Sequence, residues 1–397
     1  MSKSTVLAVG VEAPVCQRLA RLIGGSPLFS SSSLVDVQTV EQASHELAGG
    51  SVEQVIVSTS IGRDGIHSLL APLKESASVS RLALAPHKRD DVGKLLPLVH
   101  CVLWETDSDV DLLEPIERTL AVHRQFSSPT LQRLAAGFES LPALPRTYWA
   151  LVRAISRPDV GVAEVAHILE ADPAMSIKIL QLANSAIFAT SRRMTSIGQA
   201  ASLLGLDLIK GLTLSAHVFA AFDVKPVVGY SAEAVQSYSV RVARLAKRLL
   251  AATPGGDEAF AAGLVLQVGR IVAAIRAPRE FEMVVRRIAE SGEAMHLVER
   301  ELLGASHAEL GAYLLGYWGL PFSMVEAVIH HHTPSLAPGR NHPVLAAVHA
   351  ADALLGIYTC ADPEDRLDTT FLTRVGFGDQ LAHWRELAEA EADCVTV

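Results

Sequence analysis

Hydrophobic positions in the first 125 residues follow two different periods in turn. Short runs rich in β-branched residues predict five strands, at Thr5–Gly10, Val35–Val40, Gln54–Ser58, Ser80–Ala85 and Cys101–Trp104. Apolar residues at helical spacing predict helices at Pro14–Ile23, Glu41–Ala48 and Asp111–His123. Strands that alternate with helices over this length predict an α/β domain at residues 1–125, a doubly wound parallel sheet covered on both faces.

Beyond residue 125 the helical period dominates, and we expect an all-α domain at residues 126–397. The helices are expected near 147–156, 161–171, 173–184, 196–204, 207–222, 231–251, 257–275, 279–291, 293–302, 306–316, 321–332, 342–358 and 380–391. Asp172 followed by Pro173 is typical of a helix start, because an N-cap side chain accepts a backbone hydrogen bond and proline suits the first helical position.

Composition narrows the class of protein. The net charge is −9, 49% of residues are hydrophobic and 19% are charged, which excludes a disordered chain and argues against broad binding to nucleic acid. A local basic stripe remains, made of Arg241, Arg244, Lys247 and Arg248. It has two readings, a solvated face of an amphipathic helix or a site for an anion or partner.

The apolar runs fall short of the ~20 residues of a membrane span, and the N-terminus lacks the pattern of a signal peptide. The four cysteines form no CxxC pair, which favours thiols in a reducing compartment. We therefore expect a cytoplasmic protein that does not bind a membrane.

The order and size of the N-terminal elements resemble the receiver domain of bacterial response regulators. That resemblance implies a phosphoacceptor aspartate at the end of the third strand, where this chain has Val57 and Ser58. Phosphoryl transfer to a carboxylate needs a divalent cation, and the acids that would hold it are missing. We expect a degenerate, receiver-like domain; an unrelated doubly wound domain is the alternative.

Four short motifs stand in order in the second half: Leu141-Pro142-Ala143-Leu144-Pro145, Glu170-Ala171-Asp172-Pro173-Ala174, Leu182-Ala183-Asn184-Ser185 and Leu204-Gly205. Together they resemble the HDOD domain, a bacterial signalling domain related to HD-type phosphohydrolases, with its core at 131–335 and further helices at 336–397. Leu141, Pro142, Pro145, Asp172, Pro173 and Gly205 suit caps and turns. Asn184 and Ser185 have the same structural reading, with direct contact to a partner as the alternative.

The HD resemblance also implies where metal ligands would stand. Tyr238 occupies the place of the first histidine, and Leu266 and Gln267 replace the His-Asp pair. A leucine cannot bind a metal ion, and a neutral amide is a poorer ligand than a carboxylate. We therefore expect a pseudo-enzyme with no catalytic residue, no bound metal and no cofactor.

Some polar residues of the HD-type pattern remain, namely His307, His331, His332 and Asp352. The first interpretation makes them buried residues inherited with the fold. In a second, they line a pocket with Tyr238 and Gln267 that binds a nucleotide effector, such as a cyclic dinucleotide. In a third, they hold a metal ion in an altered phosphodiesterase site.

The sequence favours a non-catalytic signalling adaptor or scaffold that contacts other signalling proteins. A homodimer is a further expectation, since receiver domains often dimerise and the linker at Gln125–Ser140 can continue as a helix. A nucleotide sensor and a metal-dependent phosphodiesterase are the alternatives.

Overall fold

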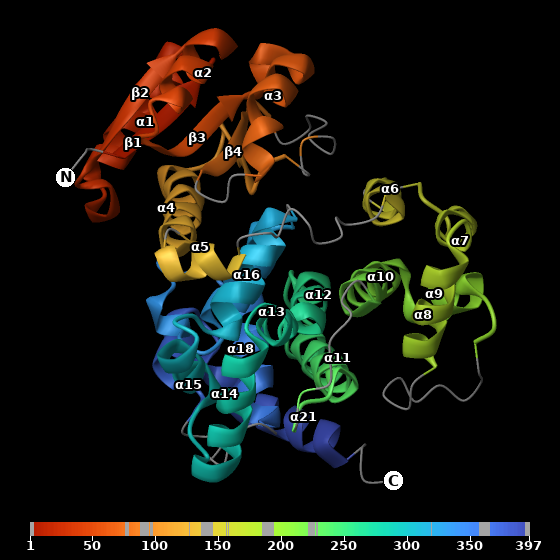
Figure 1. The fold of residues 1–397 in the computed structure, drawn as a ribbon. Coiled ribbons are helices and arrows are strands. Elements are labelled where there is room, and N and C mark those ends of the chain that lie inside the picture. Colours follow the sequence, from red (N-terminus) through yellow and green to blue (C-terminus); the bar gives the residue numbers. More distant parts are fainter. Residues whose placement is uncertain are drawn as a thin grey trace. The chain divides into compact units, whose positions relative to one another are not determined.

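The structure is a computed structural model, and it describes residues 4–75, 79–87, 95, 98–126, 128–135, 146–155, 157, 159–184, 194–220, 227, 229–318, 320–356 and 366–393 (Figure 1). Contacts within the chain group it into two compact units. The first is Met1–Gln132 with Leu315–Phe322 and Ala337–Gly339; the second is Arg133–Leu314, Ser323–Leu336 and Arg340–Val397.

A five-stranded parallel sheet forms the centre of the first unit. Its strands are β1 (Ser4–Val9), β2 (Ser32–Val37), β3 (Val52–Ser58), β4 (Ser80–Ala85) and β5 (Cys101–Trp104). They pair in the order β2-β1-β3-β4-β5, each with parallel neighbours. This is a doubly wound order, also found in receiver-type folds, and the predicted fold class of this unit is confirmed.

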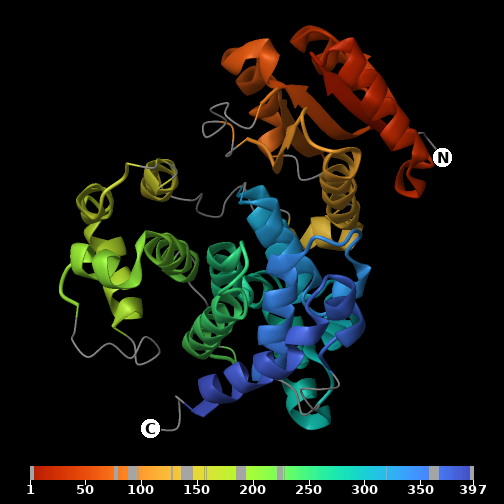
Figure 2. The ribbon, with the colours of Figure 1, turned by 180° about the vertical axis from the view of Figure 1, so that it is seen from behind.

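Helices cover both faces of the sheet because its strands are apolar on both sides. Val6 and Ala8 of β1 face α1 (Ala13–Gly25) and α4 (Asp109–Phe126). Leu7 and Val9 face α2 (Val40–Ala48) and α3 (Gly62–Leu70) on the other side. Figures 1 and 2 show these two helical layers from opposite directions. Short 3-10 turns η1 (Pro27–Phe29), η2 (Thr59–Ile61) and η3 (Pro72–Glu75) complete the connections.

One predicted strand is displaced along the sequence. We expected Val35–Val40, but β2 ends at Val37. Thr39 is instead the N-cap of α2, where its side chain accepts the backbone N–H of Gln42 and the Gln42 side chain accepts the N-cap N–H. This capping box uses the apolar Val40 as the first helical residue, so the alternating pattern ran past the true end of the strand.

Helices make up the second unit. In chain order the helices after α4 are α5 (Pro129–Ala135), α6 (Arg146–Ile155), α7 (Val162–Glu170), α8 (Pro173–Ala183), α9 (Ile197–Leu204), α10 (Leu206–Ala220), α11 (Ala232–Leu249), α12 (Gly256–Val265), α13 (Val268–Arg276), α14 (Pro278–Ser291), α15 (Met295–Leu302), α16 (His307–Tyr317), α17 (Phe322–His330), α18 (Pro343–Leu355), α20 (Thr369–Arg374) and α21 (Leu381–Asp393). Two 3-10 turns, η6 (Pro334–Leu336) and η7 (Gly378–Gln380), join the last of them. The predicted all-helical class of the second half is confirmed.

The single helix expected at 257–275 is wrong, because the chain breaks between α12 and α13. The break falls at Leu266 and Gln267, and Gln267 has φ −98° and ψ 10°, outside the helical region. One glycine in each of these two helices lies against a neighbouring backbone. A Cβ on Gly263 would lie 2.5 Å from Ala243 Cα, and one on Gly269 would lie 1.9 Å from the carbonyl oxygen of His307.

The segment Gly256–Arg276, which contains both α12 and α13, has the length and the apolar composition of a membrane span. However, 89% of its most apolar window is buried inside the protein, as expected for core helices. The apolar character of this segment is therefore accounted for by packing.

The basic stripe on α11 is only partly a solvated face. Glu391 on α21 is 2% exposed, and its two carboxylate oxygens lie 3.4 Å from Arg244 Nε and 3.0 Å from Arg248 Nη1. Trp384 of the same helix is 1% exposed and contacts Phe377. These contacts anchor α21 on α11. Lys247 Nζ also lies 2.5 Å from Asp257 Oδ1, so three of the four stripe residues form ion pairs within the chain.

Candidate functional site

Two helices, and the break between two others, carry the positions where HD-type ligands would stand. Tyr238 lies on α11, Asp352 lies on α18, and Leu266 and Gln267 form the break between α12 and α13. These helices pack on one another, α11 against both α12 and α18. The structure therefore brings residues more than a hundred positions apart to one place.

Hydrogen bonds within the protein occupy one oxygen of the Asp352 carboxylate. The Tyr238 hydroxyl donates to Asp352 Oδ1 at 2.9 Å, and the Gln267 amide lies 3.4 Å from the same oxygen. Burial, followed by the charge of Asp352, raises the pKa of Tyr238 well above its usual range, so the phenol stays protonated. Leu266 is fully buried beside them. Tyr238 and Gln267 thus donate to the one carboxylate of the HD-type pattern that this sequence retains, at the oxygen that could otherwise bind a metal ion.

A second cluster, the histidine trio, consists of His307, His331 and His332. His307 begins α16, and the other two directly follow α17. His307 Nε2 and His332 Nε2 lie 3.1 Å apart, and one ligand atom from each of the three residues lies within 4.8 Å of the others. His307 and His331 are buried, whereas His332 is half-buried. His296 of α15 stacks on His332, with ring centroids 4.2 Å apart.

Glu299 on α15 sets the tautomer of His307. Glu299 Oε2 accepts the backbone N–H of His307 at 2.8 Å, and His307 Nδ1 lies 2.5 Å from the same oxygen. The backbone donor makes this oxygen an acceptor, so Nδ1 carries a proton and Nε2 is left with its lone pair. His332 Nε2 then donates to His307 Nε2.

The neighbouring backbone sets the tautomer of His331 in the same way. His331 Nδ1 donates to the carbonyl oxygen of Val328 at 2.7 Å, which leaves Nε2 as an acceptor. That atom is buried and has no hydrogen-bond partner among the residues that the structure describes. His349 holds the same segment, because its Nδ1 donates to the His331 carbonyl at 2.7 Å and its Nε2 accepts the backbone N–H of Asp368.

Burial keeps the trio neutral. It lowers the pKa of His307 and of His332 well below the usual histidine range, and it lowers that of His331 as well. Burial also raises the pKa of the Glu299 carboxyl to about 7. His307 and His331 are thus uncharged imidazoles with a lone pair on Nε2, and His332 Nε2 carries the proton that it donates to His307.

The sequence motifs of the HDOD resemblance lie away from this pocket where they are described. Asp172 caps α8 by accepting the Met175 N–H at 3.0 Å. The Asn184 side chain bonds both the N–H and the carbonyl of Met194, and Gly205 ends α9 with φ +88°. Leu141, Pro142, Pro145 and Ser185 lie outside the described residues, and so does the side chain of Pro173.

The carboxyl ends of the sheet strands hold hydroxyls and apolar groups. Ser58 ends β3, and its hydroxyl lies 2.8 Å from that of Ser60, which donates to the Gly10 carbonyl after β1. Val57 is fully buried. A Cβ on Gly10 would lie 2.1 Å from Ile61 Cγ2, so the space above β1 is filled by an isoleucine. This arrangement matches the missing phosphoacceptor noted in the sequence.

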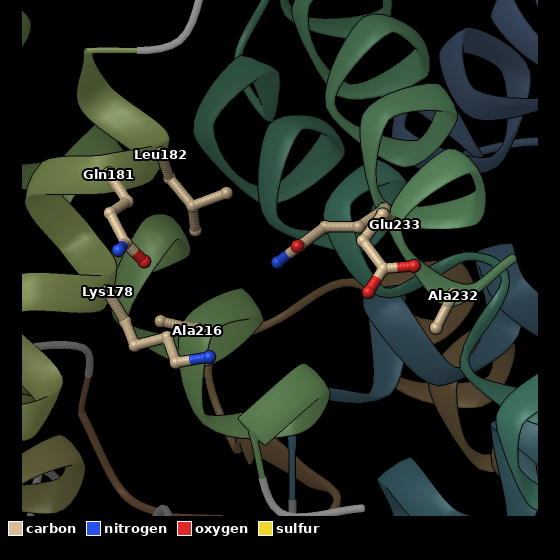
Figure 3. A pocket seen from close by; sticks show the side chains of 7 residues that line it. Lys178, Gln181, Leu182, Ala216, Ala232 and Glu233 are labelled. Carbon is tan, nitrogen blue, oxygen red and sulfur yellow. The ribbon is translucent and has the colours of Figure 1, made fainter. Parts of the chain in front are cut away.

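Sequence reasoning missed a cavity of about 290 Å³ in the second unit. Figure 3 shows residues of α8 on one side of it and residues of α11 on the other. It is lined by Lys178, Gln181, Leu182, Ala216, Ala232, Glu233 and Gln236. Leu182 belongs to one of the four sequence motifs, but the other six lining residues belong to none, so the sequence did not mark the cavity.

The fold and this pocket define a receiver-like sheet domain joined to a helical domain of HD type. Residues 141–334 match the model of the HDOD domain, so the chain contains an HDOD domain. The resemblance drawn from the sequence is confirmed.

Two crystal structures share the fold of this region. One is an HDOD domain protein of unknown function from Geobacter sulfurreducens, 21% identical, with a TM-score of 0.53 over 68% of this chain and 99% of that one. The other is a candidate signal transduction protein from Marinobacter aquaeolei VT8, 23% identical, with a TM-score of 0.52 over 70% of this chain and 66% of that one.

Among curated proteins, the chain is 25% identical over 245 residues to an uncharacterized protein of Treponema pallidum. The match covers 60% of this chain and 47% of the relative. The chain thus spans about half the length of the curated relative that it matches.

Proposed function

We propose that this protein is a non-catalytic signalling adaptor that acts through contacts with other proteins. The observation that carries the proposal is the hydrogen bonding of Asp352. Tyr238 and Gln267 occupy the oxygen that an HD-type metal site would need, and Leu266 puts a buried hydrocarbon where a ligand would stand. A hydrolase of this type needs an ion to activate water and neutralise phosphate charge.

The first unit supports the same function. Ser58 and the isoleucine side chain of Ile61 fill the strand ends where a receiver binds its cation and phosphoryl group. Both halves then transmit a signal by presenting surfaces. The partners in this proposal are other signalling proteins or a second copy of the chain. Sedimentation of the full chain over a range of concentrations tests the second copy, and a monomer at all of them excludes it.

A direct test is hydrolysis of a cyclic dinucleotide and of bis(p-nitrophenyl) phosphate, with Mn²⁺, Mg²⁺ or Fe²⁺ added to the full chain. We expect no turnover above the protein-free blank, while an active HD-type phosphodiesterase assayed alongside turns over. Turnover that disappears in Asp352→Asn would overturn the proposal.

A nucleotide-binding sensor is the second candidate, favoured by the cavity between α8 and α11. Lys178 and two glutamines offer a cation and amide groups to a phosphate and a base, and the volume is at the lower end of ligand sites. A ligand at 100 times its dissociation constant stabilises the folded state by ~2.7 kcal/mol. A thermal shift with a nucleotide panel that is lost in Lys178→Ala supports a sensor; no shift excludes it.

A further inference from the structure

The cavity between α8 and α11 has charges of opposite sign on its two walls. Lys178 and Gln181 lie on α8, and Glu233 lies in the first turn of α11 (Figure 3). We propose that this cavity binds a free α-amino acid, whose carboxylate contacts Lys178 and whose ammonium group contacts Glu233. The inference goes beyond the adaptor function, and it gives the cavity a ligand class that competes with the nucleotide of the second candidate.

The two charged groups do not neutralise each other. Lys178 forms no hydrogen bond or ion pair with any residue that the structure describes, and Glu233 forms no ion pair with any of them. The Glu233 carboxylate accepts its own backbone N–H and the Ser231 hydroxyl, the latter at 3.0 Å. These bonds, the backbone one first, lower the pKa of Glu233, so the group is ionised and keeps lone pairs for a ligand.

This pair of charges selects a zwitterion. The phosphate of a nucleotide would approach Glu233 as well as Lys178, and two negative groups at short range repel each other. A polyamine would be repelled by Lys178 for the same reason. A ligand with one negative and one positive end is attracted by both walls, and an α-amino acid is the smallest common ligand of this kind.

The uncharged part of the lining narrows the class further. None of the described lining residues is aromatic, so neither a stacked base nor a quaternary ammonium group finds its usual contact. Gln181 and Gln236 have no hydrogen-bond partner within the described ranges, and their amides can accept from an ammonium group and donate to a carboxylate. Leu182 and Ala216 offer apolar surface to the side chain of the ligand.

The size of the cavity agrees with a small ligand. Its volume of about 290 Å³ is just below the range of about 300–1,000 Å³ that is typical of ligand sites. Lys178, Gln181 and Glu233 are all exposed, so the cavity is open to solvent and an amino acid can enter it without a rearrangement of the helices.

One hydrophobic core holds the walls of the cavity. Ile179 of α8, Ala216 of α10 and Val240 of α11 belong to the same cluster of buried residues. The three helices are therefore in place before a ligand binds, which lowers the entropic cost of binding. A bound amino acid adds a link between α8 and the first turn of α11, so amide exchange should slow in both segments.

The experiment is isothermal titration calorimetry of the full chain with each standard L-amino acid, and with a nucleotide panel alongside. We expect at least one amino acid to bind. Its amide lacks the carboxylate and its N-acetyl derivative lacks the ammonium group, and each should bind about tenfold more weakly. Lys178→Met and Glu233→Gln keep the size of the side chain and remove its charge, and each should weaken binding about tenfold as well.

The matched control is Glu389→Gln, which removes the charge of an exposed glutamate on α21 and should leave binding unchanged. Circular dichroism of each variant checks the fold. The proposal is overturned if no amino acid binds, if the N-acetyl derivative binds as tightly as the amino acid, or if Glu233→Gln binds like the wild type. Binding of a nucleotide only also overturns it and supports the nucleotide sensor. The adaptor function is tested separately by hydrolysis, so its failure is distinguishable from failure of this site.

Discussion

Gly269 is the residue whose replacement tests the geometry of the pocket most sharply. It lies on α13 against the first turn of α16, and a Cβ there would be 1.9 Å from the His307 carbonyl oxygen and 2.8 Å from Gly311 N. Ordinary Cβ contacts begin near 3.4 Å, so Gly269→Ala forces the two backbones about 1.5 Å further apart. No rotamer change relieves this contact, because both atoms it meets belong to the backbone.

The expected loss of stability follows from three contributions. Overpacking of a core costs up to about 3 kcal/mol when it cannot relax easily. Displacing His307 stretches its buried bonds to Glu299, and a bond to a charged group contributes about 2 kcal/mol. Alanine recovers about 1 kcal/mol of helix propensity over glycine. The net expectation is a destabilisation of about 4 kcal/mol, a change of several hundredfold in the folding equilibrium.

Urea unfolding of the full chain, followed by far-UV circular dichroism, measures this change. With an m-value of about 3 kcal/mol per molar urea, the midpoint of the helical transition should fall by more than 1 M. Gly198→Ala is the matched control, because the nearest atoms to its Cβ are 3.9 Å away and the same change should be neutral or slightly stabilising. A Gly269→Ala midpoint within about 0.3 M of the wild type would refute the close crossing of α13 and α16.

Three further changes test separate parts of the structure. Tyr238→Phe removes the donor to Asp352, and urea unfolding should show a loss of about 2 kcal/mol; an unchanged midpoint would mean that this bond contributes nothing. Glu391→Gln breaks the ion pairs with α11. Amide exchange should therefore accelerate across α21 and stay at its wild-type rate in α7. A variant whose exchange in α21 changes no more than in α7 would contradict the anchoring role. Burial and the charge of Arg81 hold the pKa of His100 well below its usual range, so below pH ~6.5 the unfolded chain takes up a proton that the folded one does not. Stability of the first unit should therefore fall by about 1.4 kcal/mol per pH unit below that point, seen as faster exchange in β4, and His100→Gln should remove the pH dependence; the same dependence in both proteins would exclude His100 as its source.

Local patterns were sufficient for most elements of secondary structure. Alternating and helical periods predicted the five strands and nearly all the long helices, because each element buries a face that its own residues define. They failed at Val40, where a capping box begins a helix inside a strand-like run, and at Gln267, where an apolar run continues through a break between helices. In both places the decisive contact was a cap or a tertiary crossing that periodicity does not encode.

The candidate site was predictable as a list of residues and not as an arrangement. The resemblance to HD-type domains singled out Tyr238, Gln267, Asp352 and the histidine trio. It did not single out Glu299, which stands eight positions before His307 on a different helix and is an unremarkable acid in the sequence. The cavity lined by Lys178 was missed for the same reason, since its residues come from three helices.

The sequence by itself determined the two fold classes, the loss of the HD-type ligands and the absence of acids at the receiver-like strand ends. These properties depend on which residues follow one another, and a linear chain displays them fully. Only the tertiary structure decided that Tyr238 and Gln267 donate to Asp352, and that the histidine trio meets with His307 Nε2 3.1 Å from His332 Nε2. Those facts depend on where helices cross. The position of each helix crossing is set by packing between helix faces whose residues are far apart in the chain. At the closest crossings, single glycines allow two backbones to come into contact.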